Sequence, residues 1–330
     1  MRAPEFWAEP DYTARLAVRM LTPLSWAYGA TVAWKAKHAR PYRPRAMVIC
    51  VGNLTAGGSG KTPIAIEVAR ALGARGLRPV LLTRGYGGKV RGPSFVDLAN
   101  HSAAQTGDEP LLLATAAPVI IARDRAAGAK LAEENGFDVI VMDDGHQNFT
   151  LAKDLSLIVV DAETGFGNGR VLPAGPLREP VAQGLARADA VVLVGDGSPE
   201  LARFAGPVLR THLQPVRENG LAGKRVIAFA GIGRPEKFFD TLRAQGAHIV
   251  EARRYADHHA YTASEIARLN AKARDTNAML ITTEKDFVRL APIHREGIAA
   301  LPVRAVFDDP QAMDHLLATI AKRATGGKSG

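Results

Sequence analysis

Residues Val48–Pro63 read VICVGNLTAGGSGKTP: an apolar run, a glycine-rich turn and the start of a helical pattern. The β-branched run predicts a buried strand. The glycines let the backbone curl so that several N–H groups converge on one anion, and the helix N-terminus adds its positive end. This order is typical of a phosphate-binding loop for a nucleoside triphosphate. The residues predicted to hold the phosphates are Thr55, Ala56, Gly57, Gly58, Ser59, Gly60, Lys61 and Thr62.

Two residues at the end of this loop have further predicted roles. Lys61 is expected to reach the terminal phosphates as a catalytic charge, and the Thr62 hydroxyl is expected to bind Mg²⁺. Thr55 departs from the usual pattern, which has a glycine at that position. The alternative is a glycine-rich turn before an ordinary helix.

A second apolar run, Asp138–Met142, is followed by the paired carboxylates of Asp143 and Asp144. Asp143 stands where a Walker B aspartate would hold Mg²⁺ opposite Thr62, and Asp144 is expected to help position the metal or the nucleophile. An acidic strand end without a ligand is the alternative, and the phosphate-binding loop argues against it.

Composition limits the class of protein and its partners. A chain of 330 residues is long enough for about two domains. The net charge of +9 indicates an anionic partner, which is a nucleic acid, a membrane surface or a phosphorylated substrate. Cys50 is the one cysteine, so no intrachain disulfide forms, which fits a reducing compartment and a small core residue.

Residues 1–45 differ from the rest of the chain. Met20–Trp34 is uncharged, contains two tryptophans and is flanked on both sides by basic residues. It is short for a bilayer span, so we expect a helix at the membrane interface, with tryptophans at headgroup depth and basic side chains on anionic lipid. A cleaved signal peptide and an amphipathic helix packed on the core are the alternatives.

From Ala46 to about residue 217, apolar runs alternate with helical patterns. They predict an α/β fold in which helices cover both faces of a parallel sheet, with the ligand beyond the carboxyl ends of the strands. Gln214–Gly223 is predicted to be a linker, and a second α/β series follows it. The expected units are an interfacial segment at 1–45, a nucleotide-binding core at 46–217 and a smaller α/β domain at 218–330, ending in a disordered tail from Ala324.

Several loops after the predicted strands carry candidate substrate-binding residues. Arg84 and Tyr86 lie in TRGYGG, and Arg170 and Arg178 lie in a long Gly/Pro loop, Gly165–Pro180. A plain glycine turn and surface salt bridges are the respective alternatives. From the residues alone, Asp108 in GDEP is a helix cap, and the adjacent His258 and His259 are surface residues that point in different directions.

Taken together, the motifs resemble one family, the tetraacyldisaccharide 4′-kinases of lipid A biosynthesis. VGNLTAGGSGKTP, TRGYGG, GDEP, DDGHQN, NGRVLPAGPLREP, ADHH and TTEKD occur in the family's order over nearly the whole chain. One departure is that His146, Gln147 and Asn148 follow the paired aspartates, where the family usually has an apolar or aromatic residue and then Gln-His.

The resemblance implies a P-loop kinase that uses ATP and Mg²⁺ to phosphorylate the 4′-hydroxyl of a lipid disaccharide 1-phosphate. It places Asp108 at the catalytic centre with support from His258, and it adds Asn168 and Glu179 to the substrate loop. It also implies a peripheral or monotopic enzyme on the cytoplasmic face of the inner membrane. Such a substrate accounts for the basic charge without nucleic acid.

A different class remains open, a membrane-associated P-loop ATPase switch that acts through a protein partner. Such a switch would share the phosphate-binding loop and the amphipathic anchor, but it would not need the Arg/Pro/Gly loop. A guanine-specific GTPase is disfavoured because TTEKD does not match the Asn-Lys-x-Asp spacing. A nucleic-acid enzyme lacks support because the basic residues show no aromatic interleaving beyond the N-terminal segment.

Overall fold

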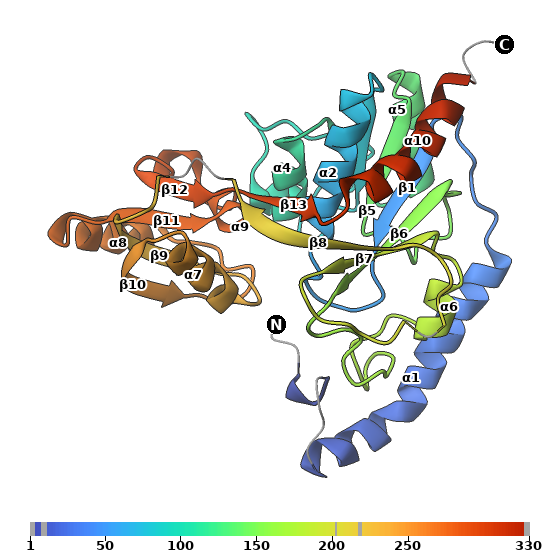
Figure 1. The fold of residues 1–330 in the computed structure, drawn as a ribbon, viewed down its shortest axis with the longest axis horizontal. Coiled ribbons are helices and arrows are strands. Elements are labelled where there is room, and N and C mark those ends of the chain that lie inside the picture. The colour runs from blue at the N-terminus through green and yellow to red at the C-terminus, as the bar shows by residue number, and fades with distance from the viewer. Residues whose placement is uncertain (1–3, 8–11, 202, 217–219, 327–330) are drawn as a thin grey trace.

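The structure, a computed structural model, describes residues 4–7, 12–201, 203–216 and 220–326. They form an α/β fold with two sheets, one of nine strands and one of four. We call the part built on the larger sheet the core unit and the part built on the smaller sheet, residues 225–301, the small unit. Figure 1 shows that the small unit lies on the opposite side of the core unit from the long helix α1 (Tyr12–His38).

The larger sheet has the strand order β13-β8-β7-β6-β1-β5-β2-β4-β3. Its inner strands are parallel, while β3 and β13 pair antiparallel with their neighbours at the two edges. The strands are β1 (Met47–Gly52), β2 (Pro79–Thr83), β3 (Ser94–Phe95), β4 (Val119–Ile121), β5 (Val139–Asp143), β6 (Leu155–Asp161), β7 (Ala190–Val194), β8 (Val208–Pro215) and β13 (Val303–Phe307).

Helices cover both faces of this sheet, as the uninterrupted apolar runs predict. One face packs against α2 (Lys61–Ala74), α4 (Asp108–Ala114) and α10 (Pro310–Gly326). The opposite face is covered by α5 (Arg125–Glu134) and α6 (Val181–Leu185). The short α3 (Ala103–Thr106) precedes α4. Alternate residues of each strand face the two layers, so β1 buries Ile49 on one side and Cys50 on the other.

The small unit has a parallel sheet in the order β10-β9-β11-β12, with a helix on each face. Its elements are β9 (Arg225–Ala230), α7 (Pro235–Ala244), β10 (His248–Arg254), α8 (Ala263–Asp275), β11 (Met279–Thr283), α9 (Glu284–Phe287) and β12 (Ile298–Leu301). Thr262 and Glu265 form a capping box at the start of α8.

The domain prediction is wrong at the C-terminus, because residues 303–326 complete the core unit instead of the small one. β13 pairs with β8, and α10 packs on the α2 face of the larger sheet. The predicted linker also begins within β8, a strand with several polar residues that lies between β7 and the edge strand β13. The predicted boundary at 217/218 and the tail residues 327–330 lie outside the described residues, whereas 324–326 are helical.

α1 lies along the outside of the core unit (Figure 1). Several of its apolar side chains are exposed to solvent. Ser25 is buried and its hydroxyl accepts a hydrogen bond from Ala174 N at 3.1 Å, so one side of the helix packs on the Gly165–Pro180 loop. Leu16, Met20 and Trp34 lie on the other side, 64%, 71% and 63% exposed. Within the described ranges, no helix has the length and apolar character needed to span a bilayer.

Candidate active site

The phosphate-binding loop joins the carboxyl end of β1 to the first residue of α2. Gly60 precedes the helix in a left-handed conformation, and Lys61 is its first residue. Gly57 and Gly58 are exposed, and an added Cβ at either would meet nothing within 4 Å, so an anion can approach the backbone closely. The Asn53 side chain donates to Ser59 Oγ at 3.1 Å and thereby supports the loop from inside.

The long Gly/Pro loop, Gly165–Pro180, which we call the Arg-containing loop, is hydrogen bonded directly to the phosphate-binding loop. Ala56 N donates to Pro176 O at 2.7 Å, and Arg178 N donates to Leu54 O at the same distance. These two bonds fix the backbone of Arg178 beside the predicted phosphate site. Its guanidinium binds both oxygens of Asp144, at 2.8 and 3.1 Å.

Lys61 also points at Asp144, with 3.6 Å between Nζ and Oδ1. Burial would raise the pKa of Asp144, but the charges of Lys61 and Arg178 outweigh it and lower that pKa. Asp144 is therefore an ionised group that orients two cations at the phosphate site. This pairing argues against Asp144 as the direct metal ligand of the two aspartates.

Asp143 at the end of β5 has the opposite environment. It is 1% exposed, and neither of its carboxylate oxygens has a hydrogen-bond partner within the described ranges. Burial, and the charges of Glu109 and Asp144, raise the pKa of Asp143 to about 7. A buried carboxylate without partners is costly unless a cation binds it. The donor chemistry fits Mg²⁺, which is commonly held by one or two carboxylates together with substrate phosphates.

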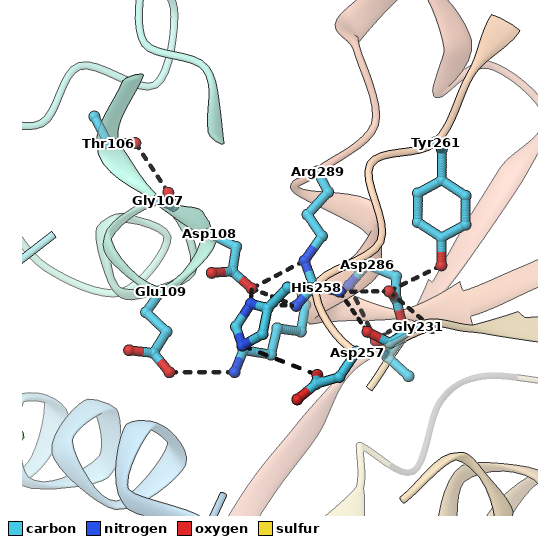
Figure 2. Close-up of polar contacts among 12 residues, drawn as sticks. Thr106, Gly107, Asp108, Glu109, Gly231, Asp257, His258, Tyr261, Asp286 and Arg289 are labelled. Carbon is cyan, nitrogen blue, oxygen red and sulfur yellow. Dashed lines mark hydrogen bonds and ion pairs between the residues drawn. The ribbon is translucent and has the colours of Figure 1, made fainter. Parts of the chain in front are cut away.

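A second cluster forms where the two units meet, around Asp108 of α4 (Figure 2). Asp108 is the first residue of the helix, and its side chain makes no capping bond, so the interpretation as a helix cap is wrong. Gly107 precedes it with φ of 88°, and a Cβ there would lie 2.2 Å from Tyr86 O. The close approach of the TRGYGG loop therefore requires glycine and turns the Asp108 side chain toward the small unit.

His258 and Arg289 of the small unit face the Asp108 carboxylate. His258 Nδ1 lies 3.2 Å from Asp108 Oδ2, and Arg289 binds the same oxygen through Nε at 2.9 Å and through Nη2. Burial would raise the pKa of Asp108, but the hydrogen bond from His258 and the charges of Lys285 and Arg289 outweigh it. They hold the Asp108 pKa well below its usual range. The carboxylate is therefore ionised at neutral pH.

Further ion pairs connect the two units. Lys285 Nζ lies 3.2 Å from Glu109 Oε1, next to Asp108 in the chain. Because Glu109 and Lys285 also act on the Asp143 pKa, the Asp108 cluster lies within electrostatic reach of the predicted metal site. On another part of the boundary, Lys237 binds Glu163 at 2.6 Å, and Arg234 binds Asp161.

The remaining predicted substrate residues differ in position. Tyr86 is largely exposed, and its ring centroid lies 6.4 Å from that of His258, a partner of Asp108. Arg84 is exposed on the same loop. Arg170 is also exposed and, with α1 and the 169–183 segment, lines a groove of about 450 Å³.

Asn168 and Glu179 hold the Arg-containing loop from within. The Asn168 amide donates to Phe6 O and Ala174 O, both at 2.9 Å. Glu179 is 1% exposed, and its oxygens accept bonds from Gln147 at 2.9 Å and Arg187 at 2.6 Å. These contacts argue against the predicted direct binding of substrate by the two residues, because their polar atoms already have internal partners.

Two polar residues were missed in the sequence. Gln147 connects Glu179 with Asn53 O at 2.9 Å, behind the phosphate-binding loop. Arg289 stands three residues after Asp286, a spacing that favours the observed pair at 2.8 Å, but its reach to Asp108 depends on tertiary structure. His259, next to His258, instead binds Glu265 at 3.1 Å on its own unit.

The sequence profile of the family described as tetraacyldisaccharide-1-P 4′-kinase matches residues 17–322. A tetraacyldisaccharide 4′-kinase from Rhodospirillum centenum is 51% identical over 97% of both chains. One from Paramagnetospirillum magneticum is 50% identical over 98% of this chain and 100% of its own. A crystal structure described as the "apo" form of LpxK from Aquifex aeolicus in complex with ATP superimposes with a TM-score of 0.76. It is 28% identical and covers 92% of this chain and 99% of its own.

Proposed function

The chain belongs to the tetraacyldisaccharide-1-P 4′-kinase family, and we propose that it transfers the γ-phosphoryl group of ATP to the 4′-hydroxyl of a lipid A disaccharide 1-phosphate. It is thus a phosphotransferase with an alcohol group as acceptor. The observation that carries this proposal is the contact between Asp108 and His258 at the boundary of the two units, within electrostatic reach of the carboxylate at the end of β5.

The phosphate-binding loop and its neighbours bind the donor nucleotide. Lys61 and Arg178, now paired with Asp144, offset the charge on the β- and γ-phosphates as the phosphoryl group leaves. Asp143 and Thr62 would hold Mg²⁺, which supplies a further positive charge on the phosphate oxygens. This role of Asp143 is supported by its buried carboxylate, whose two oxygens have no hydrogen-bond partner within the described residues.

The acceptor hydroxyl is a poor nucleophile and benefits from an oriented proton acceptor. Asp108 accepts the hydroxyl proton as the oxygen–phosphorus bond forms, and His258 orients the carboxylate and shares the proton. Because the two residues come from different units, the pair depends on how the units close over the substrates. This arrangement limits hydrolysis of ATP in the absence of the acceptor.

The exposed face of α1 is suited to a lipid substrate. Leu16, Met20 and Trp34 face away from the core unit, and basic residues lie at both ends of the helix. An apolar face next to basic side chains favours binding to an anionic lipid surface. We therefore propose that the protein acts at the cytoplasmic face of the inner membrane, where ATP is supplied.

The direct test uses the purified full-length protein, γ-labelled ATP, Mg²⁺ and the tetraacyldisaccharide 1-phosphate in mixed micelles, with no other protein present. We expect label in the lipid, at the 4′ position. Label released as free phosphate, with hydrolysis stimulated only by an added protein, would favour the P-loop switch instead. Lys61→Ala serves as the matched control for contaminating kinases.

A further inference from the structure

The Arg289 side chain makes five hydrogen bonds to described residues, two of which cross to the core unit (Figure 2). One of the other three joins Nη2 to His258 Nδ1 at 3.3 Å. Arg289 follows α9 and its side chain is 5% exposed. Within the small unit, Nη1 donates to Gly231 O at 2.7 Å and to Asp286 Oδ1 at 2.8 Å. Toward the core unit, Nε and Nη2 donate to Asp108 Oδ2. The planar guanidinium therefore has one anchored end and one end that holds Asp108.

The anchor does not depend on Arg289 for its own hydrogen bonds. Asp286 Oδ1 also accepts bonds from Gly231 N at 3.0 Å and from Tyr261 OH at 2.9 Å. Its other oxygen accepts a bond from Thr283 Oγ1 at 2.7 Å. Asp286 is thus held in place by residues of its own unit, and Arg289 binds to this fixed carboxylate. A substitution at Arg289 leaves that carboxylate with its other partners.

The contacts of Asp108 are unequal between its two oxygens. His258 and both Arg289 bonds engage Oδ2, while no hydrogen bond or ion pair to Oδ1 occurs in the part of the chain that the structure describes. Oδ1 is also not among the fully buried polar atoms that lack a hydrogen-bond partner, so it keeps some access to solvent. Oδ1 is therefore the oxygen left to accept the proton of an incoming hydroxyl.

We propose that Arg289 is a positioning residue for phosphoryl transfer: it fixes Oδ2 of Asp108 against the small unit and so presents Oδ1 to the acceptor hydroxyl. This inference rests on the proposed role of Asp108 and adds a residue to it. Arg289 itself touches neither substrate; it acts through Asp108.

The charges around Asp108 give this role a measurable signature. The groups that face it are His258 from the loop before α8, Lys285 from α9 and Arg289, with Glu109 beside it on α4. Burial would raise the pKa of Asp108, but the hydrogen bond from His258 and the charges of Lys285 and Arg289 keep it below its usual range. A base with a lowered pKa stays ionised as pH falls. The kcat/KM of wild type should therefore not decrease near the usual pKa of an aspartate; we call such a decrease at low pH the acidic limb of the profile. Loss of the Arg289 charge raises the pKa and moves that limb to higher pH.

The experiment compares wild type with Arg289→Gln and Arg289→Lys in the lipid transfer assay, measuring kcat, KM for ATP and the pH dependence of kcat/KM. For Arg289→Gln we expect a loss in kcat of about 10²-fold, because the base is misplaced, with KM for ATP nearly unchanged. We also expect the acidic limb of the pH profile to move toward the usual carboxylate range. Arg289→Lys keeps the positive charge but lacks the planar guanidinium that bonds both units. We therefore expect its acidic limb to stay at the low pH of wild type while kcat falls.

Lys237→Ala is the matched control, because Lys237 also forms an ion pair between the units, at 2.6 Å from Glu163, and does not touch Asp108. We expect its kcat and pH profile to stay within about twofold of wild type, as for an exposed ion pair. Equal losses of kcat in Lys237→Ala and Arg289→Gln would overturn the proposal. They would mean that Arg289 acts only by holding the two units together, as any ion pair between them would.

Circular dichroism checks folding of each variant. If Arg289→Gln does not fold, Arg289→Lys decides, and a wild-type kcat in it contradicts the proposal. If wild type is active and the folded Arg289→Gln variant keeps the wild-type kcat, the positioning role of Arg289 is refuted, while the proposed function still stands. A wild type that transfers no label to the lipid refutes the proposed function, and with it the role of Asp108 on which this inference rests.

Discussion

Asp108 and His258 lie with Oδ2 and Nδ1 3.2 Å apart, although one belongs to α4 of the core unit and the other to a loop of the small unit. His258 has a left-handed backbone, with φ of 59°, which is uncommon for a residue with a side chain. The contact therefore depends on a constrained loop and on the packing of the two units. The following predictions test the parts of the site separately.

Lys61→Ala removes the cation that faces Asp144 in the phosphate-binding loop. We expect kcat to fall by roughly 10²-fold or more, because the charge that develops on the phosphates is no longer offset. Steady-state transfer assays measure the loss, and thermal unfolding confirms that the fold is retained. Near-normal turnover in the folded variant would contradict the assignment of the loop.

Asp143→Asn removes one negative charge with little change of shape. The Mg²⁺ concentration needed for half-maximal activity should rise and kcat should fall, because a carboxylate is a better ligand than an amide for this ion. A Mg²⁺ titration of the transfer reaction measures both effects. If the titration curve is unchanged, the metal role belongs to Asp144 instead.

Replacement of Leu16, Met20 and Trp34 by glutamine removes apolar area from the exposed face of α1 and leaves Ser25 against Ala174. Flotation with vesicles that contain anionic lipid should show weaker binding of this variant. The triple variant is a cleaner test than deletion of α1, which also removes the support of the Arg-containing loop. Unchanged flotation would place the lipid-binding surface elsewhere.

Cys50 offers a probe of folding. Burial raises the pKa of its thiol to about 11, so at pH 8 the native thiol is protonated and shielded. Iodoacetamide should leave the native protein unmodified and alkylate it once in guanidinium chloride, as mass spectrometry can show. Rapid alkylation of the native protein would mean that β1 opens readily.

The sequence predicts the features that depend on neighbouring residues. The strand–loop–helix at Val48–Pro63 and the strand before Asp143 were predicted, since local apolar runs and glycines specify them. β8 was missed because its polar residues have the composition of a linker, and the pairing of β13 with β8 depends on contacts far apart in the chain.

The candidate site shows the same division. Asp108 follows a glycine at the start of a helix, a local pattern that favours a cap, and only the small unit gives its side chain a different set of partners. The pairing with His258 was implied by resemblance and not by spacing. Arg289 has no local signal beyond its distance from Asp286, so tertiary structure was needed to find it.

A double-mutant cycle on kcat tests the central claim most directly, that Asp108 and His258 act as one unit. The variants are Asp108→Ala, His258→Ala and the double variant, with His259→Ala as the control because that histidine binds Glu265 instead. The account predicts large losses for each single variant, little further loss in the double variant, and a nearly unchanged His259→Ala. Independent losses that add in the double variant, or a small effect of Asp108→Ala, would contradict it.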